Sequence, residues 1–220
     1  MPAFRYEAVD EGGATRKGVV NADSARSARA DLRLQGLTPL NVEAIAATPQ
    51  AIHGLTFTVN STGNGGDSNT ADNVCNDGTG TCALRAAIQQ ANVSAGTDTI
   101  TFSIGSGAQT IAPTSVLPTI TQPIVIDGTT QPGFAGTPLI ELNGAGAGAS
   151  ADGLRISAGG STVRGLVINR FTRDGIRLET LGGNTIEGNF IGTNAGGAAA
   201  LANTANGVFI SASPDNVVGG

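Results

Sequence analysis

DGLRI, at residues 152–156, recurs as DGIRL at residues 174–178 and as NGVFI at residues 206–210. A second pattern, a short β-rich stretch before glycine, keeps step with the first at residues 162–165, 185–188 and 217–220. A repeat of about 22 residues with short strands and glycine turns is typical of solenoids, in which each strand lies beside its counterpart in the next repeat. We therefore predict stacked parallel strands, and we call one repeat a rung.

The middle residues of these copies form a predicted charged column. Alternate residues of a strand point to opposite sides, so the first and third apolar residues of each copy should face the core and the middle one should face outward. Arg155 and Arg177 are the outward residues of adjacent rungs, and like charges side by side are mildly destabilising. An acidic glycan or phosphate would relieve the repulsion, which makes both residues candidates for anion or glycan binding. The alternative is that Asp152, Asp174 and solvent already neutralise them.

The composition restricts the fold class. The 220 residues include 33 Gly, no Trp and seven Phe, and 13% are charged. A helical bundle would be richer in Ala, Leu, Glu and Lys, collagen would place Gly at every third position, and 40% hydrophobic residues argue against disorder. The net charge of -5 and the lack of a basic run disfavour nucleic acid as a partner. A glycine-rich, mainly β fold remains.

The charge distribution divides the chain near residue 46. Residues 1–46 carry 12 charged side chains and residues 47–220 carry 17. The first part is predicted to form a small ββαβ module, with strands at residues 4–9, 16–20 and 39–45 and a helix from Asp23 or Ser24 to Leu34, ended by Gly36. Residues 47–56 form a predicted linker, in which His53 is expected to be exposed. No apolar run is long enough for a membrane span, and no signal peptide is seen.

The first part also carries a family resemblance. MPAFRYEAVDEGGATRKGV, at residues 1–19, and ADSARSARADLRLQGLTPLNVE, at residues 22–43, resemble the N-terminal arm of the type II secretion system F-protein family. The core of that family is an inner-membrane platform protein. The resemblance implies a cytoplasmic type of module that contacts secretion-system proteins. The helical bundles and membrane spans that follow the arm in that family have no counterpart in this sequence.

The two cysteines predict a local disulfide. Cys75 and Cys82 lie seven positions apart in a polar loop, and no His or further Cys is near enough to complete a zinc site. A disulfide between them would indicate an oxidising compartment. The same loop, Asn64 to Thr81, is rich in Asp and Asn oxygens that suit calcium, but Ala71 occupies one ligand position of the expected spacing. The alternative is a turn-rich loop closed by the disulfide, with no metal or other cofactor.

The second part resembles another family. CNDGTGTCALRAAIQQAN, at residues 75–92, resembles the CSLREAI motif of bacterial secreted or surface right-handed β-helices, although Ala83 and Ala86 replace the Ser and Glu of that motif. IDGTTQPGFAGTPLIELNG at residues 126–144 and STVRGLVINRF at residues 161–171 extend the match. The apolar spacing within residues 84–91 independently predicts a short amphipathic helix, which suits a cap on the first rung.

The resemblance implies a fold class and domain bounds. The fold is a right-handed parallel β-helix, a pectin-lyase-like solenoid, with an N-terminal capping helix. The cap is expected at residues 57–97 and the rungs at residues 98–220, with truncation at the C-terminus because the sequence stops within a repeat. Residues 57–220 are expected to be extracytoplasmic, secreted or on the cell surface.

The sequence offers little catalytic chemistry. The single Lys is Lys17, outside the rungs, and the acids on the predicted strands are scattered. Asp152 and Asp174 could stack one rung apart as a carboxylate pair, but Asn206 takes the same position in the third copy, which favours a turn role. Arg164 and Glu187 form a predicted ion pair between rungs. We predict no catalytic residues.

The predicted function is therefore non-enzymatic. The rungs would form a secreted or cell-surface module that presents a binding surface to a glycan or a surface protein, fused to an arm of the type II secretion type. One alternative is a fragment of a polysaccharide lyase or hydrolase whose catalytic rungs are missing. A second alternative is a type II secretion component defined by its arm.

Overall fold

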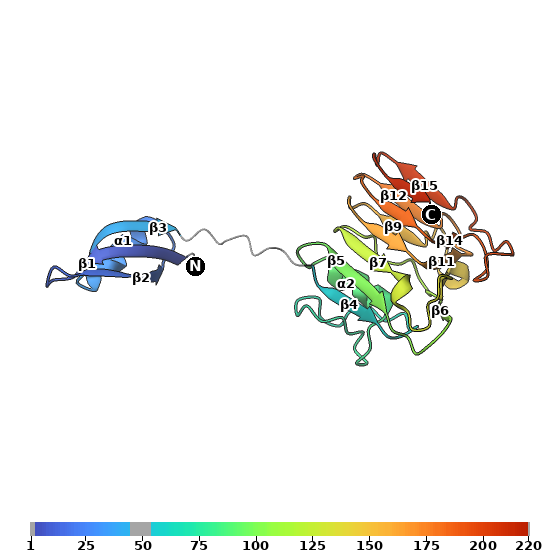
Figure 1. Ribbon diagram of the computed structural model, residues 1–220, viewed down its shortest axis with the longest axis horizontal. Coiled ribbons are helices and arrows are strands. Elements are labelled where there is room, and N and C mark those ends of the chain that lie inside the picture. The colour runs from blue at the N-terminus through green and yellow to red at the C-terminus, as the bar shows by residue number, and fades with distance from the viewer. Residues whose placement is uncertain (1–2, 45–53, 220) are drawn as a thin grey trace. The chain divides into compact units, whose positions relative to one another are not determined.

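The structure is a computed structural model that describes residues 3–44 and 54–219. The chain divides into two compact units, Met1–Ala51 and Ile52–Gly220, and each is described by itself. Figure 1 shows their elements. His53 and most of the predicted linker lie outside the described residues.

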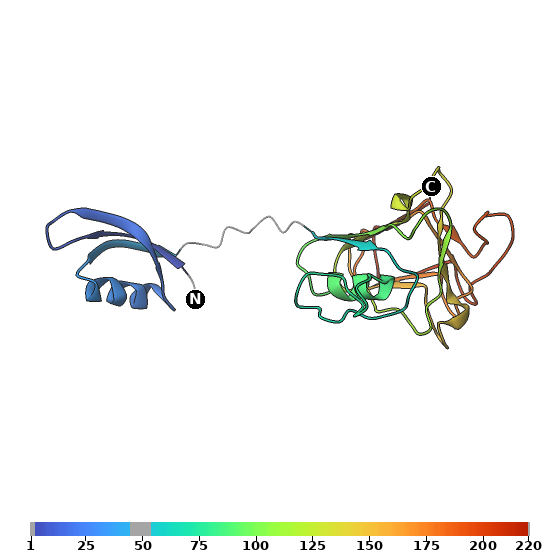
Figure 2. The same ribbon diagram turned by 90° about the horizontal axis from the view of Figure 1, so that it is seen from below.

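The first unit is a three-stranded antiparallel sheet with one helix. The sheet order is β2-β1-β3, and Figure 2 shows the helix along one face of this sheet. The elements are β1 (Ala3–Val9), β2 (Thr15–Asn21), α1 (Ala25–Leu34) and β3 (Thr38–Ala44). The Ser24 side chain accepts a hydrogen bond from the Ser27 N–H and begins the helix, and Gly36, with a φ of 75°, follows its end. The helix buries Ala28 and Leu32 against Phe4.

The second unit is mainly β, with three parallel sheets. The first sheet has the order β16-β13-β10-β7-β5-β4, the second β14-β11-β8-β6 and the third β15-β12-β9. First-sheet strands are β4 (Thr56–Val59), β5 (Asp98–Phe102), β7 (Ile124–Asp127), β10 (Thr162–Arg164), β13 (Thr185–Glu187) and β16 (Val217–Gly219). Second-sheet strands are β6 (Gln109–Ile111), β8 (Ile140–Asn143), β11 (Leu166–Asn169) and β14 (Phe190–Ile191), and third-sheet strands are β9 (Leu154–Ile156), β12 (Ile176–Glu179) and β15 (Val208–Ser211).

The chain visits the three sheets in rotation. From β7 to β16 each strand belongs to the next sheet, so every third strand returns to the same sheet and pairs in parallel with the strand before it. The 3-10 turns η1 (Gly128–Thr130) and η2 (Gly144–Gly146) follow β7 and β8. Earlier in the chain, Ile120 makes a parallel bridge to Ile156 of β9 and extends the third sheet. One rung is therefore one passage through all three sheets.

The register confirms the predicted stacking of the repeats. Strands β9, β12 and β15 pair in parallel so that Leu154, Ile176 and Val208 lie in one row, and Figure 1 shows the three strands side by side. The alternation is also confirmed in the first two copies, where the first and third residues are buried. In the third copy it is wrong for Ile210, which is 46% exposed. The reason is that β15 is the edge of its sheet, so only one neighbouring strand covers it.

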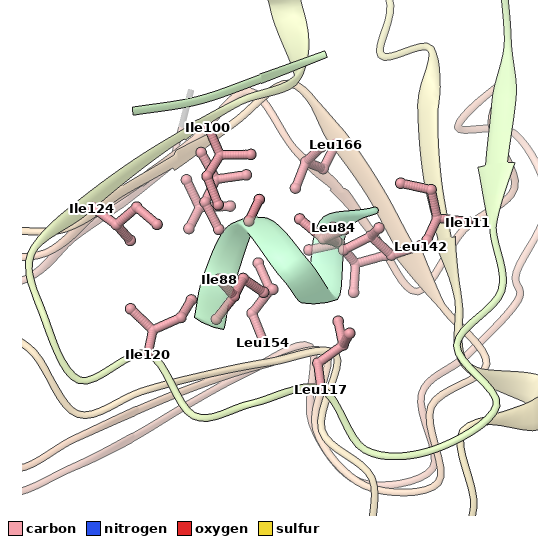
Figure 3. Close-up of a cluster of buried hydrophobic side chains, with 14 of the residues drawn as sticks. Leu84, Ile88, Ile100, Ile111, Leu117, Ile120, Ile124, Leu142, Leu154 and Leu166 are labelled. Carbon is pink, nitrogen blue, oxygen red and sulfur yellow. The ribbon is translucent and has the colours of Figure 1, made fainter. Parts of the chain in front are cut away.

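A short helix, α2 (Leu84–Ala91), lies against the apolar core of these sheets. Its residues Leu84 and Ile88 are buried, as the sequence spacing predicts. Figure 3 shows both beside Ile100, Leu154 and Leu166, which come from the first, third and second sheets. The helix thus joins side chains of all three sheets in one core.

Candidate functional site

The predicted charged column lies on the outward side of the third sheet. Arg155 of β9 is the register partner of Arg177 of β12, which in turn pairs with Phe209 of β15. The guanidinium of Arg177 lies 4.3 Å from the centroid of the Phe209 ring. The two arginines named from the sequence are thus adjacent, and an aromatic ring continues their column.

Glu179 bridges the two arginines. One carboxylate oxygen lies 2.6 Å from an Arg155 Nη atom, and the other lies 3.0 Å from Arg177 Nε. Burial raises the pKa of Glu179, but the hydrogen bonds from Arg155 and Arg177 lower it more, so the pKa lies below its ordinary value. Glu179 therefore carries the charge that relieves the repulsion. The sequence contains a signal for this role of Glu179. Glu179 lies two positions after Arg177 on one strand, and side chains two positions apart on a strand point to the same side.

The alternative predicted from the sequence, that Asp152 and Asp174 neutralise Arg155 and Arg177, holds only for Asp174 and Arg177. Asp174 Oδ2 lies 3.1 Å from Arg177 Nη1, whereas Asp152 Oδ2 lies 3.7 Å from Arg173 Nη1. Within residues 54–219, the ion-pair partner of Arg155 is Glu179 and not Asp152. No role for Arg173 follows from the repeat pattern.

Asp152 and Asp174 lie one rung apart, but their carboxylates accept hydrogen bonds from backbone N–H groups of the next rung. Asp152 accepts a hydrogen bond from the Asp174 N–H at 3.2 Å, and Asp174 accepts one from the Asn206 N–H at 3.2 Å. Both acids are buried, and burial raises the pKa of Asp152. Their hydrogen bonds therefore link successive turns, the role that the presence of Asn206 favours.

Arg164 lies between two acids on the first sheet. It is in register with Asp127 of β7 and Glu187 of β13. An Arg164 Nη2 atom lies 2.6 Å from Asp127 Oδ2, whereas Nη1 lies 3.9 Å from Glu187 Oε1. The predicted pair with Glu187 is therefore the longer of two contacts. The pair with Asp127 was missed because its interval of 37 residues does not follow the repeat.

Asp127→Asn is expected to lower the free energy of unfolding at pH 7 by about 1 kcal/mol, because it removes the buried carboxylate that pairs with the half-exposed guanidinium of Arg164. Burial raises the pKa of Asp127, but hydrogen bonds from Arg164 and Thr129 lower it more, so the net shift is downward. A carboxylate with a depressed pKa stabilises the fold above its unfolded pKa and loses this contribution as the pH falls through its folded pKa. The difference between wild type and variant should therefore shrink below about pH 4.

Urea denaturation at pH 7 and pH 3, followed by circular dichroism, measures this difference. Glu187→Gln is the matched control, because the exposed Glu187 contact at 3.9 Å should contribute less than about 0.5 kcal/mol. A deficit of Asp127→Asn that is equally large at both pH values would contradict the ion-pair explanation.

The predicted disulfide between Cys75 and Cys82 is present, with their Cα atoms 5.2 Å apart. The loop that it closes uses its acids for turns: Asp67 accepts from the Asn69 N–H, and Asp77 accepts from the Thr79 N–H. Among the described residues, no three acidic, His or Cys side chains gather as metal ligands would. The prediction of no cofactor stays a prediction, and so does its alternative, calcium in this loop.

The comparisons concern the first unit. A family model described as "Type II secretion system protein F, N-terminal domain" matches residues 1–43. Neither the curated proteins nor the solved structures contain a match to this chain. In the described ranges 3–44 and 54–219, no helix has the length and apolar character that a membrane crossing needs. The arm of the chain is thus similar to one domain of the secretion protein, and residues 44–220 lie beyond that match.

Proposed function

We propose that the second unit is a right-handed parallel β-helix that acts as a non-enzymatic binding module, secreted or on the cell surface. The rotation of strands among three parallel sheets supports this fold, and so does the helix packed on their core. The disulfide supports an oxidising compartment. The binding partner is a glycan or a surface protein.

The column on the third sheet carries this proposal. Arg155, Arg177 and Phe209 stand on three parallel strands, which gives the column a rigid backbone. The Arg155 side chain is 44% exposed and its guanidinium has donors beyond those that Glu179 accepts. A carboxylate on a glycan can accept from those donors, and an aromatic ring can pack against a sugar face.

Titration with trigalacturonate at low ionic strength tests this role, because exposed charge interactions are screened by salt. Arg155→Ala should weaken binding about tenfold, since it removes a charged donor. Glu179→Gln should tighten binding, because it removes the negative charge that both guanidinium groups share and that would repel a carboxylate of the glycan. Arg29→Ala, an exposed arginine of α1, is the control and should leave binding unchanged. Equal affinity in wild type, Arg155→Ala and Glu179→Gln would overturn the assignment.

The family match of the first unit favours a second function, participation in type II secretion. We infer that the arm contacts proteins of such a secretion system, as the matched domain description suggests. Co-purification of the full chain with the proteins of a type II secretion system is expected. The same chain without residues 1–46 should lose that association, and its retention would contradict the role of the arm.

A further inference from the structure

A cleft of about 290 Å³ lies at the carboxyl ends of first-sheet strands, where the chain turns toward the second sheet. Its walls include Thr129, Phe134, Arg164 and Glu187, and three glycines complete it. The cleft thus collects Arg164 and Glu187, the last residues of β10 and β13, together with residues that follow β7, β10 and β13. These three strands are neighbours in the first sheet. Because β7, β10 and β13 pair in parallel, their carboxyl ends lie side by side, and the paired strands hold Arg164 and Glu187 in place.

The cleft offers donors, an acceptor and an apolar wall. Asp127 accepts a hydrogen bond from Nη2 of Arg164, whereas Nη1 lies 3.9 Å from Glu187 and keeps its donors. The Arg164 side chain is 44% exposed. The Glu187 side chain is 47% exposed, so its carboxylate can accept further hydrogen bonds. Phe134 is half-buried, and its ring forms the apolar wall of the cleft. Rigid polar groups beside an aromatic wall are the chemistry of a small-molecule pocket.

The charges of the cleft restrict the ligand. Two carboxylates, those of Asp127 and Glu187, flank one guanidinium, that of Arg164. A ligand with its own carboxylate would meet more negative than positive charge there, and like charges at close range disfavour binding. A neutral ligand rich in hydroxyl groups can donate to Glu187, accept from Arg164 and place an apolar face on Phe134.

We propose that this cleft binds one neutral sugar ring of an oligosaccharide. Its volume is close to the lower end of ligand pockets, about 300 Å³, which suits a single ring rather than a long chain segment. This site rests on the same general role as the column, glycan binding, but it lies on a different sheet and takes a different sugar class. Either site can therefore fail while the other stands.

The test measures binding of neutral trisaccharides of glucose, mannose and N-acetylglucosamine to the full chain by calorimetry, with trigalacturonate in parallel. Phe134→Leu keeps an apolar side chain but removes the ring, and Glu187→Ala removes the acceptor. Phe190→Leu is the matched control, because it removes a half-buried ring that lies outside both the cleft and the column. Thermal unfolding of each variant checks that the fold is retained.

At least one neutral trisaccharide is expected to bind. Phe134→Leu and Glu187→Ala should each weaken that binding about tenfold, the effect of losing roughly 1.4 kcal/mol, and Phe190→Leu should leave it unchanged. Neutral binding that survives both cleft substitutions would overturn the cleft and leave glycan binding in place. Binding of trigalacturonate alone, sensitive to Arg155→Ala, would also overturn the cleft and support the column. Absence of binding by every saccharide would overturn both.

Discussion

Gly153→Ala is expected to lower the free energy of unfolding of the second unit by about 3 kcal/mol. A Cβ atom at Gly153 would lie 2.4 Å from the carbonyl oxygen of Gly175 and 2.7 Å from Cγ2 of Ile168. That carbonyl accepts a hydrogen bond from the Leu154 N–H at 3.0 Å, so it cannot retreat without weakening the pairing of β9 and β12. The glycine is needed for a close approach between rungs.

Gly207→Ala is the matched control, because Gly207 is the same position of the third copy. A Cβ atom there would meet Cγ2 of Ile191 at 3.5 Å, an ordinary contact. The substitution also restricts the unfolded chain, so we expect a change between zero and a gain of about 1 kcal/mol. Equal destabilisation by both substitutions would show that glycine flexibility, rather than the close approach, explains the repeat.

Urea denaturation can separate the two units. The single Tyr, Tyr6, lies in β1 and the chain has no Trp, so tyrosine fluorescence follows the first unit. Most strands lie in the second unit, so circular dichroism follows mainly that unit. Gly153→Ala should move the transition seen by circular dichroism and leave the fluorescence transition unchanged. The fluorescence transition and the circular dichroism transition have to be fitted separately, because a two-state fit applies to one cooperative unit.

Replacing Cys75 and Cys82 together by Ala is expected to lower the free energy of unfolding of the second unit by about 2.5 kcal/mol. The disulfide closes a short loop with a sequence separation of 7, and its loss gives the unfolded chain more freedom. The loop keeps other attachments to α2, since Gln89 accepts from the Asp67 N–H and Gln90 donates to the Thr70 carbonyl. We therefore expect a less stable fold and not an unfolded one.

Denaturation with and without dithiothreitol measures this effect. Reductant should destabilise the wild type by a similar amount and should leave the double Ala variant unchanged. The transition of the first unit, which has no cysteine, provides an internal control. Equal stability of oxidised and reduced wild type would show that the disulfide does not stabilise the second unit.

The strands and the disulfide could be predicted because their causes are local or periodic. Ser24 and Gly36 mark the ends of α1 through their own backbone preferences. The row of Leu154, Ile176 and Val208 follows from the repeat, since strands with the same pattern pair in the same register. These features need no knowledge of how the loops run.

The candidate binding surfaces could be predicted only in part. The repeat places Arg155 beside Arg177, but the path of each side chain decides that Glu179 bridges them. The cleft has a weaker signal still, because Phe134 lies in an irregular stretch between η1 and β8 that no repeat reproduces.

The sequence by itself determined the two-part organisation, the parallel rows of strands and the outward position of the arginines, because each depends on spacing along the chain. Only the tertiary structure decided which acid neutralises each arginine and where a cleft opens. Asp127 reaches Arg164 across 37 positions, an interval that includes irregular loops. Side-chain partners of that kind depend on the three-dimensional path of the loops, and no periodic pattern encodes that path.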